Sequence, residues 1–546
     1  MGNRSEVIQQ NKEENQMKRN VLGILAVTSL LLLAGCNGGG ETSTSDKGGS
    51  NKPDTPATST YKDYSEPNHS KPTPIATNGG KVLNIRCWNN EFEGRFENYY
   101  PGATKVSDNT YTIPSKSGTG TVTVKFNITP NDNNGYQNAL DAALSKSNPA
   151  ADDKVDMFLM EADYALKYAN SDYSLDVHDL GLTDTDLSDM YDYTKVIASD
   201  TRPGMNKALK GVSWQAAPGL YAYRNDIAKQ LWSDYPADPE ATDTAAVKAQ
   251  KTKAQSEFVQ AKLADWTKFD AVAAEAKAKG YYMLSGYDDS YRTFSNNATT
   301  SWVKKYVEDE DGVKTSMVTL DPQIKTWIKQ TKNYTEKGYS HKTSLWDGDW
   351  AKDQGPTGKV FGFFYSTWGI NFTLLGNSLA TPTDKGGKEE LGNGLYGQYR
   401  VCQGPASYYW GGTWIVGAQG TDNKAEVADI MKQLTCTKAI DKKITVDTQD
   451  YTNNKTAMHE LATDTNFGSS FLGGQNHIAL FEESAKKIKM AAMSPIDQTC
   501  NEGIQKAMKD YFAGTVDYKT AIKNFKATVK SKVPAVVFDE TFDAAL

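Results

Sequence analysis

Residues 81–88 read Lys81-Val82-Leu83-Asn84-Ile85-Arg86-Cys87-Trp88, and this stretch decides the fold. Its length and apolar content are typical of a β-strand. Apolar residues then recur at helical spacing over 92–99, residues 121–128 alternate as a second strand, and a second helix follows over 136–144. Residues 155–160 form a short apolar run that fits a buried strand. This β-α-β-α-β order predicts an α/β fold with a mostly parallel sheet.

The rest of the chain continues the alternation of strands and helices. We expect a helix over 266–276 with Gly280 near its C-terminal cap, and a hairpin of 302–307 and 315–320 with its tip at 308–312. Strands are expected at 221–223, 360–364 and 399–401, a helix at 425–435, and helices in the last eighty residues. The residues after 80 are too many for one hydrophobic core, so two lobes are predicted.

The N-terminal segment predicts export. Lys18 and Arg19 precede an apolar run over 21–33, which is too short for an ordinary membrane span. The following Leu33-Ala34-Gly35-Cys36 resembles a bacterial lipobox, which implies cleavage before Cys36 and its lipidation; the alternative is a cleaved signal with an incidental cysteine. We therefore expect residues 1–35 to be a lipoprotein signal peptide, with Met17 as the expected translation start. Residues 36–80, which are rich in Gly, Ser, Thr and Pro, are expected to form a disordered tether that begins with the lipidated cysteine. The chain would be anchored to the extracytoplasmic side of the cell membrane.

The composition excludes some functions. With 60 Lys and Arg against 67 Asp and Glu, the net charge of -7 argues against a nucleic-acid partner. Five His and five Cys leave little material for a metal site or a disulfide framework, and no cofactor is predicted. Free buried thiols are favoured, and a bridge between Cys402 and Cys436 is the alternative.

The sequence lacks the common catalytic motifs. We find no GxxxxGK[ST], GxSxG, HExxH or CxxC, and the SxxK and SDN matches at 484–487 and 107–109 stand in the wrong order for a penicillin-interacting enzyme. Acidic pairs at 288–289, 347/349 and 482–483 leave a glycosidase open as an alternative, although such pairs are commoner on solvated loops. A non-enzyme is therefore predicted.

Aromatic and polar residues gather where the predicted strands end. Trp88, Asn89 and Glu91 follow the first strand, and Glu161 and Asp163 follow the third. Further along, Trp214, Trp368 and Trp410 lie beside other predicted strands. Ligands of open α/β sheets bind outside the carboxyl ends of strands. Aromatic rings cover the apolar face of a sugar, and carboxylates and amides bond its hydroxyls. This mixture predicts a sugar site; simple core packing is the alternative for each ring.

From residue 81 onward the chain resembles the extracellular solute-binding proteins of carbohydrate ABC importers, the group that includes maltose-binding protein. Besides the lipobox and the opening strand, the matching segments are Asp156-Met157-Phe158-Leu159-Met160-Glu161-Ala162-Asp163, Ala222-Tyr223-Arg224-Asn225-Asp226, residues 266–280, residues 359–368, Tyr409-Trp410-Gly411-Gly412-Thr413-Trp414 and Tyr511-Phe512-Ala513-Gly514. Inserts are expected near 101–120 and 234–257.

The resemblance implies a two-lobed, type II periplasmic-binding-protein fold with strands crossing between the lobes. Lobe one would hold 81–212 and 406–470, and lobe two 213–405 and 471–546. The implied ligand-binding residues are Trp88, Asn89, Glu91, Glu161, Asp163, Trp214, Tyr291, Trp368 and Trp410, of which Tyr291 is placed by the run Asp288-Asp289-Ser290-Tyr291-Arg292-Thr293-Phe294. The implied partners are a carbohydrate, favoured as an oligosaccharide, and the membrane permease of an ABC importer, for a monomeric protein. A glycan-sensing or glycan-capturing lipoprotein without a permease is the other alternative.

Overall fold

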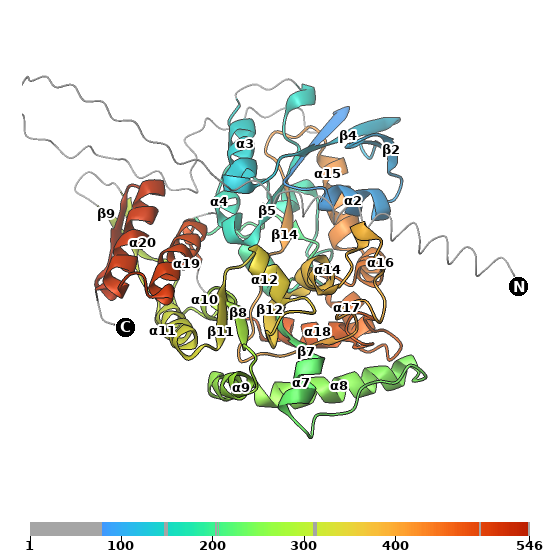
Figure 1. Ribbon diagram of the computed structural model, residues 1–546. Helices are drawn as coiled ribbons and strands as arrows, with labels where there is room; N and C mark the ends of the chain where they lie inside the picture. The colour runs from blue at the N-terminus through green and yellow to red at the C-terminus, as the bar shows by residue number, and fades with distance from the viewer. Residues whose placement is uncertain are drawn as a thin grey trace, which may run out of the picture. The chain divides into compact units, whose positions relative to one another are not determined.

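The computed structural model describes residues 79–146, 151–202, 205, 207–308, 314–490, 493–543 and 546 (Figure 1). The predicted signal peptide, Cys36 and nearly all of the tether lie outside these residues, as does most of the predicted hairpin tip. No helix of the described residues is both long and apolar enough to cross a bilayer.

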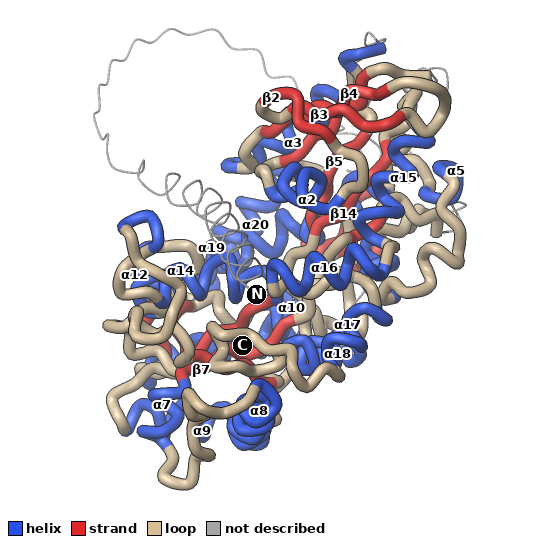
Figure 2. Tube along the Cα trace, turned by 90° about the vertical axis from the view of Figure 1, so that its right-hand side faces the viewer, coloured by secondary structure: helices blue, strands red, loops and turns tan. Residues whose placement is uncertain are grey.

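A seven-stranded sheet holds the opening strands. Its order is β2-β3-β4-β1-β5-β14-β6, with β1 (Val82–Cys87), β2 (Thr104–Ser107), β3 (Thr110–Pro114), β4 (Thr121–Ile128), β5 (Met157–Glu161), β6 (Val212–Ser213) and β14 (Thr413–Gly417). Figure 2 labels β2, β3, β4, β5 and β14 of this sheet. The predicted strands at 81–88, 121–128 and 155–160 are therefore confirmed. The intervening helices are α2 (Glu91–Tyr99) and α3 (Gly135–Leu144), again as predicted.

The prediction of a mostly parallel sheet is wrong. Only β1–β4 and β1–β5 run parallel, whereas β2–β3, β3–β4, β5–β14 and β14–β6 are antiparallel. The connection from β2 to β3 has two residues, with Asn109 at a φ of 58°, and so short a turn can only join antiparallel strands. These two strands lie in the segment expected to be an insert.

The order of the three parallel strands creates a topological switch point. Because β1 lies between β4 and β5, the two crossover connections leave in opposite directions, and the carboxyl ends of β1 and β5 meet at this switch point. Below it, α2 buries Phe92 and Phe96 against Phe126 of β4, with ring centroids 6.0 and 5.4 Å apart.

Three smaller sheets form a second group. They are β12 (Gly362–Ser366), β7 (Gly219–Arg224) and β13 (Tyr399–Cys402), all antiparallel; β11 (Ser340–Thr343) with β8 (Leu284–Gly286); and β15 (Val536–Phe538), β10 (Lys314–Val318) and β9 (Val303–Glu308). The hairpin of β9 and β10 confirms the prediction, and β15 was not foreseen.

The α-helices that follow α3 differ widely in length, and the longest is α8, with 18 residues. They are α4 (Ala165–Ala169), α5 (Val177–Leu180), α6 (Asp192–Ile197), α7 (Asn225–Leu231), α8 (Ala245–Lys262), α9 (Trp266–Ala278), α10 (Tyr291–Ser295), α11 (Pro322–Lys337), α12 (Gly348–Asp353), α13 (Thr367–Gly369), α14 (Leu375–Ser378), α15 (Lys424–Thr435), α16 (Lys438–Thr448), α17 (Lys455–Ala462), α18 (His477–Lys487), α19 (Asp497–Ala513) and α20 (Tyr518–Lys532). The predicted helices at 266–276, at 425–435 and in the last eighty residues are confirmed, and Gly280 follows the α9 cap at a φ of 84°.

Two of the segments that cross between the groups lie side by side. Residues 214–218 lead from β6 to β7, and residues 403–412 lead from β13 to β14. Gly219 N–H donates to the Tyr408 carbonyl at 2.8 Å, and Trp410 N–H donates to the Ala217 carbonyl at 3.1 Å.

The four cysteines of the described residues are free thiols, three of them buried and Cys436 half-buried. Burial raises the pKa of the Cys87 and Cys436 thiols to about 12.

Candidate functional site

The end of β1 provides the first predicted residues. Trp88 is half-buried, and its ring contacts Tyr136 and Tyr164 edge to face, with centroids 5.4 and 6.4 Å apart. Asn89 is half-buried as well, and its side-chain oxygen accepts from the backbone N–H of Glu91 at 3.1 Å, at the first residue of α2. These residues follow the carboxyl end of β1, beside the switch point in the strand order.

The end of β5 provides two carboxyl groups. Glu161 is the last residue of the strand, and its Oε2 accepts from the backbone N–H of Asp163 at 2.8 Å, which caps the short turn Ala162–Tyr164. Burial, and then the negative charge of Asp163, raise the pKa of Glu161 to about 8. A neutral carboxyl at pH 7 donates one hydrogen bond as well as accepting, which suits a hydroxyl-rich ligand.

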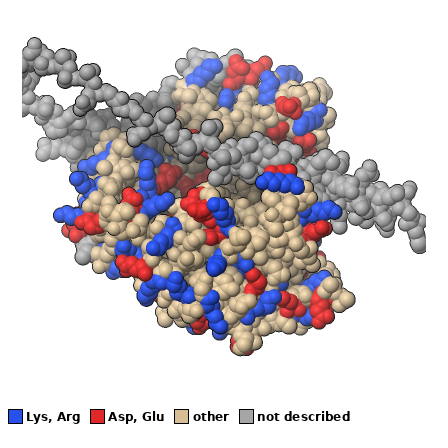
Figure 3. Space-filling view, viewed as in Figure 1, with Lys and Arg blue, Asp and Glu red and all other residues tan. Residues whose placement is uncertain are grey.

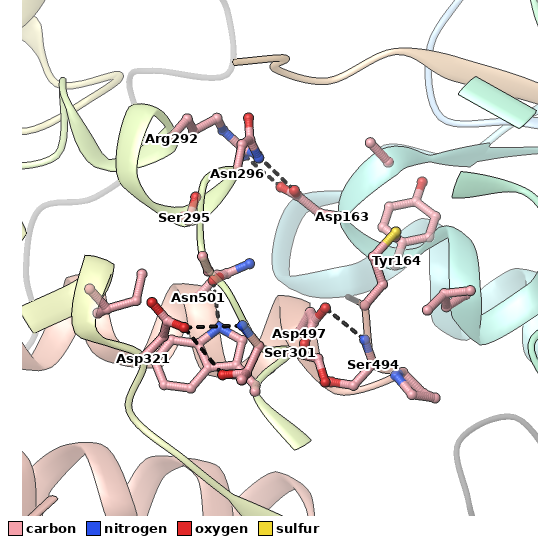
Figure 4. Close-up of a pocket in the computed structure, with 18 of the residues that line it drawn as sticks. Asp163, Tyr164, Arg292, Ser295, Asn296, Ser301, Asp321, Ser494, Asp497 and Asn501 are labelled. Carbon is pink, nitrogen blue, oxygen red and sulfur yellow. Dashed lines mark hydrogen bonds and ion pairs between the residues drawn. The ribbon is translucent and has the colours of Figure 1, made fainter. Parts of the chain in front are cut away.

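Asp163 forms a bidentate ion pair with Arg292 of α10, as Figure 4 shows. The Nη1–Oδ1 and Nη2–Oδ2 distances are 2.8 and 2.6 Å. Burial alone would raise the pKa of Asp163, but the Arg292 guanidinium lowers it below its usual value. Because Asp163 follows a strand of the large sheet and Arg292 lies on a helix after β8, this pair bridges the two groups of sheets.

A cavity that opens to solvent lies around this ion pair. One wall comes from the turn after β5, and the others come from α10, from the segment leading to β9 and from the start of α19, as Figure 4 shows. It presents amide and hydroxyl groups, among them those of Ser295, Asn296 and Ser301. No group of three or more potential metal ligands occurs among the residues that the structure describes.

The charged side chains that line this cavity have protein partners. Lys167 Nζ lies 2.6 Å from Asp141, and Asp321 accepts from the backbone and hydroxyl groups of Thr299 and Thr300. Asp497 accepts from the backbone N–H of Ser494 at 2.8 Å. The two cations of the lining, Lys167 and Arg292, are therefore matched by carboxylates, whereas Asp321 and Asp497 are hydrogen-bonded by neutral donors.

Two predicted tryptophans continue the site. The Arg292 guanidinium lies 5.6 Å from the ring centroid of Trp410. Trp368 is half-buried, its Nε1 donates to the Trp410 carbonyl at 2.8 Å, and the two rings meet edge to face at 5.2 Å. A Cβ on Gly411 (φ 71°) would lie 3.0 Å from Trp368 Nε1 and 3.7 Å from Glu161 Oε1, so this position keeps the carboxyl and the indole close.

Trp214 and Tyr291 lie behind the site. Trp214 is 1% exposed, stacks on Phe92 at 5.2 Å, and has the Arg95 guanidinium 5.3 Å from its ring. Tyr291 is 2% exposed and donates its hydroxyl to Asn501 at 2.5 Å. In this conformation neither ring offers a free face.

Glu91 belongs to a hydrogen-bonded polar network and does not line the cavity. Its Oε1 lies 3.2 Å from both Arg95 Nη2 and Gln215 Nε2, and those two groups also donate to Asp450 at 2.7 and 2.8 Å. Thr367 donates to the other oxygen of Asp450 at 2.7 Å. The network therefore ties the end of β1 to the crossing segment and to the residue before Trp368.

The structure thus gathers Glu161, Asp163, Trp368 and Trp410 around Arg292, which the sequence did not single out. Trp88, Asn89 and Glu91 lie along the end of β1. The only local signal for Arg292 was its position directly after the predicted contact Tyr291.

Comparisons with known proteins match at the level of structure. No protein-family model and no curated protein matches the chain. A solved extracellular solute-binding protein of family 1 matches with a TM-score of 0.55 and 16% identity, over 82% of this chain and 99% of that one. An ABC-transporter-associated binding protein from B. animalis subsp. lactis Bl-04 matches with a TM-score of 0.53 and 14% identity, over 85% of this chain and 100% of that one. The GacH receptor of Streptomyces glaucescens matches with a TM-score of 0.52 and 13% identity, over 84% of this chain and 100% of that one. The predicted fold is therefore confirmed: this chain has the two-lobed, type II periplasmic-binding-protein fold of extracellular solute-binding proteins.

Proposed function

We propose that the chain captures a carbohydrate between its lobes and delivers it to the membrane permease of an ABC importer. The observation that carries this proposal is the Asp163–Arg292 ion pair in the lining of a polar cavity, with the Trp410 ring beside Arg292 and the Trp368 ring beside Trp410. Two of the similar structures support it: one is a complex with β-1,6-galactobiose and the other comes from a study of acarbose complexes.

The chemistry of the site fits a neutral sugar. Indole rings cover the C–H face of a pyranose, and hydroxyls, amides and the neutral carboxyl of Glu161 bond its rim. Since the cationic groups of the cavity lining are paired within the protein, an anionic sugar would have to break an existing pair to be neutralised.

Binding without catalysis fits the carboxylates. A glycosidase needs two carboxyl groups on opposite sides of one glycosidic bond. Here Glu161 and Asp163 come from the same turn, and both oxygens of Asp163 are engaged by Arg292. We infer that the sugar leaves unaltered.

Closure couples binding to delivery. The Asp163–Arg292 pair spans the two groups of sheets and forms only when they approach. A sugar that contacts both walls shifts the equilibrium toward the closed form by its differential affinity. The closed form would be the one that a permease recognises.

We further infer that Cys36 carries the lipid that holds the chain on the extracytoplasmic face of the membrane, and that the mature protein acts as a monomer. The lobes would hold 81–212 with 406–470, and 213–405 with 471–546.

Isothermal titration calorimetry of the mature chain against neutral and uronic-acid glycans tests the proposal. We expect saturable binding of at least one neutral glycan, recovered intact afterwards by chromatography. Release of new reducing ends would show an enzyme instead, and absence of binding across both sets of glycans would reject carbohydrate capture.

A further inference from the structure

Three aromatic side chains form a cluster that extends outward from the cavity. We call Trp346, Trp368 and Phe372 the outer aromatic cluster. Trp346 is 48% exposed and Phe372 is 51% exposed, which is unusual for side chains of this size. Neither lines the cavity around the ion pair. Two such rings on either side of a half-buried indole point to a ligand for them.

Trp346 is held in a backbone conformation that bulky residues avoid. Its φ is 72°, in the left-handed region. The loop that carries it is fixed on both sides: Asp347 accepts from the backbone N–H groups of Ser344 and Trp350 at 3.0 and 2.9 Å, and Asp288 accepts from that of Leu345 at 3.1 Å. Backbone strain of this kind persists only where the surroundings impose it, and it is common at binding sites.

Phe372 is presented by a second irregular element. It lies in the π-helical turn Ile370–Leu374, directly after α13. A π-turn inserts an extra residue and rotates the side chains that follow, and it occurs often at functional sites. The Phe372 ring lies 6.5 Å from that of Trp368 at an angle of 64°.

The cluster is connected to the cavity lining through Trp410 and Arg292. The ring of Trp346 is 6.1 Å from that of Trp368 with only 16° between their planes, and 6.1 Å from that of Trp410. Arg292 then lies over Trp410. A row of aromatic rings thus runs from the ion pair, through the buried Trp410, to the exposed Trp346.

We propose that the outer aromatic cluster is an additional subsite, which stacks against a further pyranose of an oligosaccharide whose other units occupy the cavity. This inference rests on the proposed function and deepens it, because it makes chain length a determinant of affinity. Trp368 is the member of the cluster that contacts Trp410, whereas Trp346 and Phe372 act only on the longer ligand.

The test is calorimetry of the full mature chain with one neutral glycan series of increasing length. For Trp346→Ala and Phe372→Ala we expect about three- to tenfold weaker binding of the longer members, with the shortest binding member unchanged. Trp346→Phe should retain most of the affinity. Leu391→Ala, at a site 71% exposed, is the matched control for loss of an exposed apolar side chain. Thermal unfolding of each variant checks its fold.

Each outcome decides the inference. Equal losses for all lengths, or no loss for the longer members, would overturn it while leaving carbohydrate capture intact. Wild-type binding of the longer members with no gain over the shortest would also overturn it. If the variants bind glycans normally but fail to support uptake, the cluster contacts the permease and the subsite is rejected. Failure of the wild-type chain to bind any glycan would reject the proposed function itself.

Discussion

The Asp163–Arg292 ion pair makes closure testable. We consider Asp163→Asn, Arg292→Gln and the double variant. At about 4 Å and an effective dielectric of about 20, the attraction between two unit charges is about 4 kcal/mol. The two side chains are 27% and 23% exposed, so solvent screening and the desolvation of both ions reduce this considerably. We expect a net contribution of about 1–2 kcal/mol to the closed form, which is a factor of about 5 to 30 in its population.

The predicted result is weaker ligand binding without loss of the fold. Each single variant should bind the preferred glycan about 5- to 30-fold more weakly in calorimetry, because closure contributes less. Small-angle scattering at one fixed, subsaturating glycan concentration should show a larger radius of gyration than the wild type. The unfolding midpoint should change little, since the pair joins elements of different sheets rather than a core. Lys253→Gln, which breaks an exposed pair with Glu257, is the control.

The double variant separates closure from direct contact. If the pair acts as a unit, removing both partners should cost about as much as removing one, giving a coupling of about 1–2 kcal/mol. Strictly additive losses would mean that Asp163 and Arg292 contact the glycan independently. Unchanged affinity in both single variants would refute the reasoning that this pair stabilises the closed form.

Three further predictions concern the same site. Trp368→Ala should weaken glycan affinity at least tenfold in calorimetry while leaving the melting temperature nearly unchanged; equal affinity would reject its stacking role. The folded chain raises the pKa of Glu161 from 4.5 to about 8, so ionising this carboxyl costs more free energy in the folded state than in the unfolded state. The free energy of unfolding of the wild type, measured by chemical denaturation, should therefore fall relative to that of Glu161→Gln as the pH rises from about 5 to 8. Parallel pH profiles of the two proteins would contradict this. Gly411→Ala adds a Cβ 3.0 Å from Trp368 Nε1 at a φ of 71°, so it should cost about 1–3 kcal/mol of stability and weaken binding, whereas a variant as stable as wild type would contradict the close approach.

Apolar strands could be predicted and polar ones could not. The strands β1, β4 and β5 bury alternate or continuous apolar side chains, and that pattern is visible in the sequence. The strand β2 is exposed along its whole length, and its residues Thr104–Ser107 carry no apolar alternation. Its place in the sheet depends on backbone pairing with β3, which leaves no compositional trace.

The candidate site was predictable where it follows strand ends. Glu161 and Asp163 are placed by the end of β5, so locating the strand located them. Arg292 is 129 residues away from Asp163 in the sequence, and no local pattern links the two. Trp214 and Tyr291 show the converse: an aromatic residue near a strand end either faces a ligand or packs inward, and only the fold decides which.

The burial of the cysteines has a practical consequence for watching the protein move. Thiol reagents attack the thiolate, and the raised pKa values of Cys87 and Cys436 keep both thiols almost entirely protonated at neutral pH. Cys402 and Cys500 are fully enclosed. A single cysteine engineered on each side of the cavity would therefore take up a maleimide dye against a low background, so donor–acceptor energy transfer can follow opening and closing in single molecules.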